Sequence, residues 1–271
     1  MNHALKTLAA SLVLVGAATC ADAMDIAGLN VPSGPVFAVA QLYENAIQGV
    51  GNTLSGYGEV DSINGQAVNT LCANCELTYR FTDYVVSSID ATEFRVTGGI
   101  VNFYLGFGAN NDFNPLTSAG SAADFAAATN GTLFLTLRGH AIDAAGNTFS
   151  TTGLNIGSAT PSGGGSGLAD VDMTGGGIAN AFFNTNAVPA LFGGGNADFV
   201  LTSSFNALFP PHPAECHRGE GPSCLSGFSD FRGNLTPVPE PETYPLMLAG
   251  LGALSVMARR RRRRQSCSPI E

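Results

Sequence analysis

Short runs of aromatic and β-branched residues, separated by glycine, asparagine and aspartate, recur through the middle of the chain. Alternating runs bounded by turn residues are typical of strands, and many of them in succession indicate a mainly β fold. We therefore expect a β-sandwich or jelly-roll-like domain. The expected strands are 78–86, 93–96, 100–107, 132–140, 147–152 and 197–205.

Three parts of this pattern carry more specific predictions. The first run, read with a period of two, places Tyr79, Phe81 and Asp83 on one face of its strand. The turn residues at 143–146 indicate that the runs 132–140 and 147–152 form a hairpin. The alanine-rich segment 121–129 begins with a serine that suits a helix N-cap, so it is the expected helix.

Two further segments are open between alternatives. Residues 35–48 are compatible with a strand or with a short helix. Residues 153–177 contain nine glycines in 25 residues. This composition fits a flexible loop, and it equally fits tight turns around a strand at 168–173.

The first 23 residues have the pattern of a secretory signal peptide. Lys6 supplies the positive charge, an apolar run follows at 8–18, and a small-x-small cleavage site lies at 21–23. A buried first helix is the alternative. We therefore assign residues 1–23 to a signal helix and residues 24–236 to an exported β-rich domain.

The exported region is acidic. Between Met24 and Pro237 lie 17 acidic residues and five arginines, a net charge of −12, and the one lysine of the chain is Lys6. Proteins that bind nucleic acid present a basic face to the phosphates. The charge therefore excludes nucleic acid as a partner and disfavours binding to an anionic membrane surface.

The C-terminal region combines a Pro-Glu-Pro segment, a short apolar run at 244–258 and six arginines at 259–264. As a helix, the apolar run would be about 22 Å long, against about 30 Å for the hydrocarbon layer of a membrane. Flanking arginines can extend such a helix by snorkelling, and they favour the cytoplasmic side. We expect a single transmembrane helix that anchors the precursor transiently in the inner membrane.

These three parts, in this order, resemble the PEP-CTERM sorting signal of Gram-negative bacteria. The resemblance implies recognition by an exosortase, a membrane protease-transpeptidase, with cleavage near Pro-Glu-Pro and release or transfer to the cell surface. Such proteins are associated with exopolysaccharide and biofilm matrix.

Tyr244 stands where the family often has tryptophan, and a short tail, 265–271, extends past the arginines. An ordinary tail anchor would explain the arginines but not Pro-Glu-Pro. The residues of the predicted signal, within 237–264, are Val238, Pro239, Glu240, Pro241, Arg259, Arg260, Arg261 and Arg262.

Four cysteines remain in the exported region, at Cys72, Cys75, Cys216 and Cys224. Export leads to an oxidising compartment, where disulfides are the default. We predict two local pairs, Cys72–Cys75 and Cys216–Cys224, with cross-pairing as an alternative. A redox role for the first pair is disfavoured because a strand rather than a helix follows it. A zinc site that combines these thiols with nearby histidines is a further alternative.

Candidate metal ligands occur at Asp170, Asp172 and Thr174, which match the first half of a calcium loop. Ala181 occupies the position at which such a loop needs a bidentate glutamate, and a second partial set at 110–114 is followed by proline. Calcium bound in an irregular loop is therefore an alternative to a solvated turn. The sequence indicates no other cofactor.

The sequence contains no nucleophile elbow, phosphate loop or dinucleotide fingerprint. We therefore expect a non-catalytic protein of the cell surface or extracellular matrix, sorted by an exosortase and associated with exopolysaccharide. One alternative is a carbohydrate-binding surface module, with or without calcium, although the absence of tryptophan counts against sugar stacking. The other alternative is a surface polysaccharide hydrolase that uses paired carboxylates.

Overall fold

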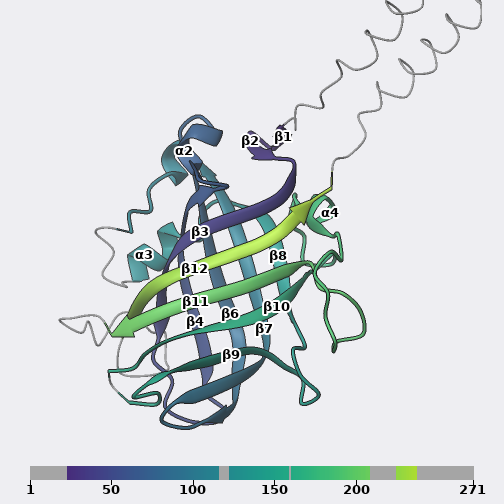
Figure 1. Cartoon of the computed structure of the whole chain (residues 1–271). Coiled ribbons are helices and arrows are strands. Elements are labelled where there is room, and N and C mark those ends of the chain that lie inside the picture. Colours follow the sequence, from purple (N-terminus) through teal and green to yellow (C-terminus); the bar gives the residue numbers. More distant parts are fainter. Residues whose placement is uncertain (1–22, 116–121, 159, 208–223, 237–271) are drawn as a thin grey trace, which may run out of the picture. The chain divides into compact units, whose positions relative to one another are not determined.

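The computed structural model describes residues 23–115, 122–158, 160–207 and 224–236, and these residues are mainly β (Figure 1). The strands are β1 (Ala23–Ile26), β2 (Leu29–Pro32), β3 (Gly34–Asn45), β4 (Thr53–Ile63), β5 (Gln66–Ala67), β6 (Cys75–Ile89), β7 (Glu93–Phe107), β8 (Thr132–His140), β9 (Asn147–Leu154), β10 (Ser162–Val171), β11 (Phe199–Ala207) and β12 (Cys224–Leu235). The helical segments are short: α2 (Val68–Leu71), the 3-10 turn η1 (Gly108–Asn110), α3 (Ala122–Ala127) and α4 (Asn180–Phe183).

The strands form a closed antiparallel barrel, not the sandwich or jelly roll expected from the sequence. Eight strands follow one another around the wall in the order β3, β4, β6, β7, β8, β10, β11 and β12. The barrel closes because β12 pairs with β3 along its whole length, from Cys224 opposite Asn45 to Leu235 opposite Gly34. Alternating strands suit both architectures, and pairing between the first and last wall strands makes this one a barrel.

The predicted hairpin between 132–140 and 147–152, which form β8 and β9, is wrong. Strand β8 pairs with the later part of β7, and β9 pairs with its earlier part, both antiparallel. On the other side, β10 pairs with β9 and then with β8. Hence β8 and β9 run in the same direction and share one position in the wall, interrupted by the turn at 141–146.

Two predicted runs, 93–96 and 100–107, form the single strand β7. Gly98 and Gly99 lie between them with φ of +74° and +97°, a conformation that favours glycine. Facing them on β6, Asp83 has φ of +63° and is exposed. The predicted common face of Tyr79 and Phe81 is confirmed, since both are buried, but Asp83 does not share it.

The glycine-rich segment contains the strand β10, which covers 162–171 and therefore begins earlier than the strand considered at 168–173. Its inward positions include Gly165 and Gly167, which flank the ring of Phe149 from β9. A Cβ atom at either glycine would lie 2.5 or 2.6 Å from an atom of that ring. Because these two glycines have no side chains, there is room for the ring of Phe149.

The interior of the barrel is filled mainly by apolar and aromatic side chains. Phe231 from β12 contacts Tyr79 of β6 and Phe103 of β7, with ring centroids 5.1 and 4.9 Å apart. Because β12 is separated from β6 in the sheet order by β3 and β4, these contacts cross the lumen. A contact of this kind couples opposite sides of the barrel.

One end of the barrel carries the β1–β2 hairpin together with α2 and α4 (Figure 1). The hairpin buries Ile26, Leu29 and Val31 almost completely, and they belong to the main hydrophobic core. Beyond β12, the backbone N–H and the hydroxyl of Thr236 both donate to the carbonyl oxygen of Phe182, at 2.9 Å each. The end of the closing strand is therefore held against α4.

Candidate functional site

Glu44 is the one acidic group among the described side chains that line a cavity inside the barrel. Every second side chain of β3 points into the barrel, and this inward set ends with Leu42 and Glu44. Glu44 is 5% exposed. Within the described part of the chain, no residue donates a hydrogen bond to its carboxyl group or forms an ion pair with it.

The cavity beside Glu44 has a volume of about 50 Å³. Its wall is mostly apolar, and its aromatic members come from β6, β9 and β12. They are Tyr79, Phe81, Tyr84, Phe149 and Phe231. The hydroxyl of Tyr79 donates to the carbonyl oxygen of Gln41 at 2.6 Å, which fixes this ring in the wall. The lumen thus combines one ionisable acid with several aromatic rings.

The environment of Glu44 changes its ionisation. Burial raises the pKa of Glu44 to about 8, because a low-dielectric interior disfavours the charged carboxylate. Burial also raises the pKa of Tyr79 and of Tyr84 above the ordinary value for tyrosine. At pH 7 the carboxyl group of Glu44 is therefore mostly protonated and uncharged.

Glu44 was not predicted as a functional residue. Residues 35–48 were compatible with a strand or a helix, and the position of the Glu44 side chain depends on which of the two forms. Read as a strand, the segment places Glu44 in line with Leu42 and the apolar residues before it. An acid that continues an apolar face was the signal that the sequence offered.

A cluster of three acidic residues lies on the outer side of the barrel wall. Glu59 and Asp61 line a surface hollow together with residues 111–115. Behind it, Glu76 is 1% exposed: its Oε2 accepts a hydrogen bond from the backbone N–H of Phe113 at 2.9 Å, and its Oε1 has no partner among the described residues. Burial raises the pKa of both Glu59 and Glu76 to about 7, and the nearby Asp61 adds to the effect at Glu59.

The predicted oxygen set at 110–114 lies beside this hollow. Asn110 donates to the carbonyl oxygen of Asn130 at 3.2 Å, and Asn130 in turn donates to Asp112 at 2.9 Å. These contacts tie the loop to the segment before β8. In the described ranges, no three His, Cys, Asp or Glu side chains are grouped so that they could hold a metal ion.

The predicted calcium ligands Asp170, Asp172 and Thr174 lie at the end of β10, with their oxygens engaged by protein groups. Asp170 contacts Nδ1 of His140 at 2.8 Å. Asp172 accepts from the backbone and hydroxyl of Thr174 at 3.0 and 2.7 Å, and from Nε of Arg138. Burial acts to raise the pKa of Asp172, but these hydrogen bonds outweigh it and lower the pKa. Calcium binding here stays a prediction.

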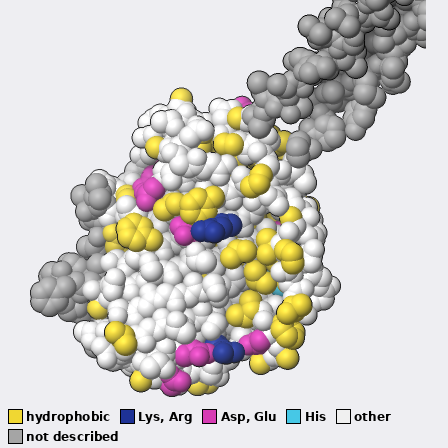
Figure 2. All heavy atoms as spheres, in the orientation of Figure 1, with side chains coloured by type: hydrophobic (Ala, Val, Ile, Leu, Met, Phe, Trp, Pro, Cys, Tyr) yellow, Lys and Arg dark blue, Asp and Glu magenta, His cyan; other side chains and the backbone are white. Residues whose placement is uncertain are grey.

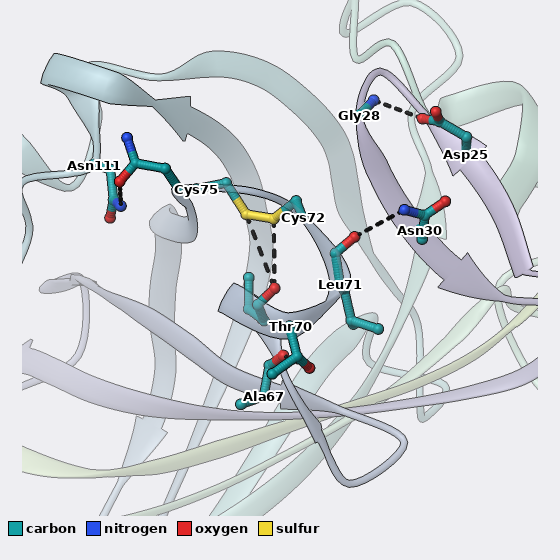
Figure 3. Close-up of a disulfide and its surroundings, with 11 residues drawn as sticks. Asp25, Gly28, Asn30, Ala67, Thr70, Leu71, Cys72, Cys75 and Asn111 are labelled. Carbon is teal, nitrogen blue, oxygen red and sulfur yellow. Dashed lines mark hydrogen bonds between the residues drawn. A yellow bond between two sulfur atoms is a disulfide. The ribbon is translucent and has the colours of Figure 1, made fainter.

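The cysteines at 72 and 75 form a disulfide, as predicted (Figure 3). Cys72 follows the last residue of α2, and Cys75 begins β6, so neither thiol lies at a helix N-terminus that would activate it. Nearby, Asn30 donates to the carbonyl oxygen of Leu71 at 3.1 Å and links the β1–β2 hairpin to α2. Cys216 lies outside the described residues, so the Cys216–Cys224 pair stays a prediction.

The predicted sorting signal also lies outside the described residues, as do residues 1–22 of the predicted signal helix. Its last residue, Ala23, begins strand β1 and is not helical. The chain divides into two units after Thr236, one residue beyond β12. In the ranges from 23 to 236 that the structure describes, no helix is both long and apolar enough to cross a membrane. The transmembrane helix expected at 244–258 therefore stays a prediction.

The family model for the PEP-CTERM protein-sorting motif matches residues 237–263. The chain carries a PEP-CTERM sorting signal. This match confirms the resemblance seen in the sequence, and it implies an exported, membrane-anchored precursor that an exosortase recognises and processes. Comparison of the chain with curated proteins and with solved structures gave no match.

Proposed function

We propose that the protein is a non-catalytic component of the cell surface or extracellular matrix, where it associates with exopolysaccharide. The observation that carries this proposal is the position of the PEP-CTERM motif. The matched segment begins at Pro237, and the closing strand β12 ends at Leu235. Cleavage within the motif would therefore leave every wall strand of the barrel in the delivered product.

Deleting residues 238–271 tests this proposal. We expect the truncated protein to be exported but lost from the surface and matrix fractions, because it lacks the segment that an exosortase recognises. Quantitative immunoblotting of periplasm, membrane, surface and medium fractions measures the redistribution. Deleting 265–271, which lies beyond the matched segment, is the control and should leave the distribution unchanged. An unchanged distribution of the longer deletion would contradict the proposal.

Direct carbohydrate binding is the second candidate function, and an exposed aromatic side chain favours it. Phe228 on β12 is 58% exposed and lies opposite Gln41 of β3 and Ser204 of β11. On the same outer face, the guanidinium of Arg232 lies 4.7 Å from the ring centroid of Phe37. Figure 2 shows that much of the face it presents is neither hydrophobic nor charged. An exposed ring with polar neighbours suits a ligand that has both apolar and hydroxyl-bearing surfaces.

The variant Phe228→Ala tests this second candidate. We expect it to weaken cosedimentation with exopolysaccharide from the producing bacterium about ten-fold, the effect of losing about 1.4 kcal/mol of binding free energy. Leu191→Ala is the matched control, since Leu191 is 95% exposed on the loop between α4 and β11. Equal binding by both variants and the unmodified protein would exclude Phe228 as a contact. Repeating the assay with EDTA would show whether binding needs calcium.

A further inference from the structure

The carboxyl group of Glu44 is buried inside the barrel without a protein partner among the described residues. Burying a carboxyl group is costly unless hydrogen bonds or an opposite charge compensate for the lost hydration, and folded proteins rarely leave such groups unsatisfied. Among the described residues that line the cavity, none is an arginine or a histidine. None of the described residues supplies this compensation, and a group that enters the cavity would supply it.

The size of the cavity limits what can enter. A water-sized group needs a cavity volume of roughly 10–15 Å³. The cavity beside Glu44 has a volume of about 50 Å³. The cavity therefore accepts roughly three to five non-hydrogen atoms. Water is poorly suited to most of this space, because an ordered water needs two to four polar partners and the wall is mainly apolar.

The wall also indicates the charge of the ligand. The aromatic rings of Phe81, Tyr84 and Phe231 line the cavity together with Glu44. Aromatic faces attract organic cations, and a carboxylate adds a full opposite charge. Once ionised, Glu44 would repel an anion and would gain no opposite charge from a neutral molecule. An ammonium group favours the ionised form of Glu44 and pairs with it.

We propose that the barrel binds a small organic cation, a primary or methylated amine with three or four non-hydrogen atoms, with its ammonium group against Glu44. The partly exposed side chains of Phe149 and Ser203 also line the cavity, so it approaches the surface on that side. This binding site is independent of how the protein is sorted. It would give the surface protein a ligand other than a polysaccharide.

Binding is coupled to the release of a proton. Burial raises the pKa of Glu44 to about 8, so below that pH the carboxyl group must ionise before it can pair with an ammonium group. The affinity should therefore rise about ten-fold for each pH unit between pH 6 and 7. Among the described residues, the other titratable groups that line the cavity are Tyr79 and Tyr84 of β6, which stay protonated in this range because burial raises their pKa.

Isothermal titration of the full-length protein in detergent with ethylammonium and trimethylammonium chloride tests the proposal. Ethanol serves as the neutral analogue of ethylammonium, and sodium chloride controls for ionic strength. We expect binding of at least one amine, absent for ethanol, that strengthens from pH 6 to 7. Glu44→Gln should abolish binding. Glu59→Gln should retain it, because Glu59 has a raised pKa but faces the outer hollow.

Two results would overturn the proposal. One is the absence of amine binding at pH 8.5, where Glu44 is largely ionised. The other is binding that survives in Glu44→Gln or is matched by ethanol, since neither would depend on the carboxylate. Thermal unfolding of both variants, followed by circular dichroism, shows that a lost signal does not come from a lost fold.

Discussion

Raising the pH from 4.5 to about 8 is expected to destabilise the protein, and Glu44 should be the largest single cause. Its pKa is about 8 in the folded protein, against the ordinary value of 4.5 that applies to the unfolded chain. Between these values the folded protein holds a proton that the unfolded chain releases. The stabilisation is therefore complete below pH 4.5 and is lost as the pH rises through 8. The shift corresponds to at most about 5 kcal/mol in the free energy of unfolding.

Urea unfolding at a series of pH values, followed by circular dichroism, measures this slope. Glu44→Gln should flatten the slope and make the protein more stable than the unmodified form at pH 8.5. Some slope should remain, because burial also raises the pKa of Glu59 and Glu76 to about 7. An unaltered slope in Glu44→Gln would show that the carboxyl group is not buried as described.

Phe231→Ala is expected to lower the free energy of unfolding by about 3–5 kcal/mol, the usual cost of removing a buried aromatic ring. Phe231 is 5% exposed, and its ring contacts Tyr79 and Phe103 across the lumen. Phe228→Ala is the matched control on the same strand. Phe228 is exposed on the outer face, so its replacement should change the free energy of unfolding by about 0.5 kcal/mol or less.

A double-mutant cycle extends this test to the closure of the barrel. Phe231 and Phe103 lie on strands that do not pair with each other, and they meet only because the wall curves round. Their alanine variants should therefore be non-additive, with a coupling of about 0.5–3 kcal/mol. Additive effects, or equal costs at Phe228 and Phe231, would contradict the described lumen.

The sequence predicted four of the eight wall strands, β6, β7, β8 and β11, because each follows from a local alternation of side chains. It left β3 and β10 open between alternatives, and it did not indicate β4 or β12. It did not predict the barrel, because closure depends on β12 pairing with β3, strands that lie far apart in the chain. The same limit explains the wrong hairpin. The turn residues at 143–146 suit a reversal of direction, but β7 and β10 align β8 and β9 in one direction.

Among the functional features, those that are local in sequence were predicted and those that depend on distant strands were not. The sorting signal and the Cys72–Cys75 disulfide are local in sequence, and both were predicted correctly. Glu44 was missed because its chemistry depends on burial by strands from elsewhere in the chain. Asp170 and Asp172 had the spacing of metal ligands, yet His140 and Arg138 contact them in the fold. Spacing alone does not show which groups an acid will meet.

We propose that an exosortase delivers an intact barrel to the cell surface. The most direct test is the intact mass of the protein recovered from the surface and from the medium. We predict a chain that begins after Ala23, keeps all of β12 and ends within residues 239–242. A recovered chain whose mass still includes the arginines at 259–264 would contradict exosortase processing, and the protein would then be a membrane-anchored protein with an uncleaved tail.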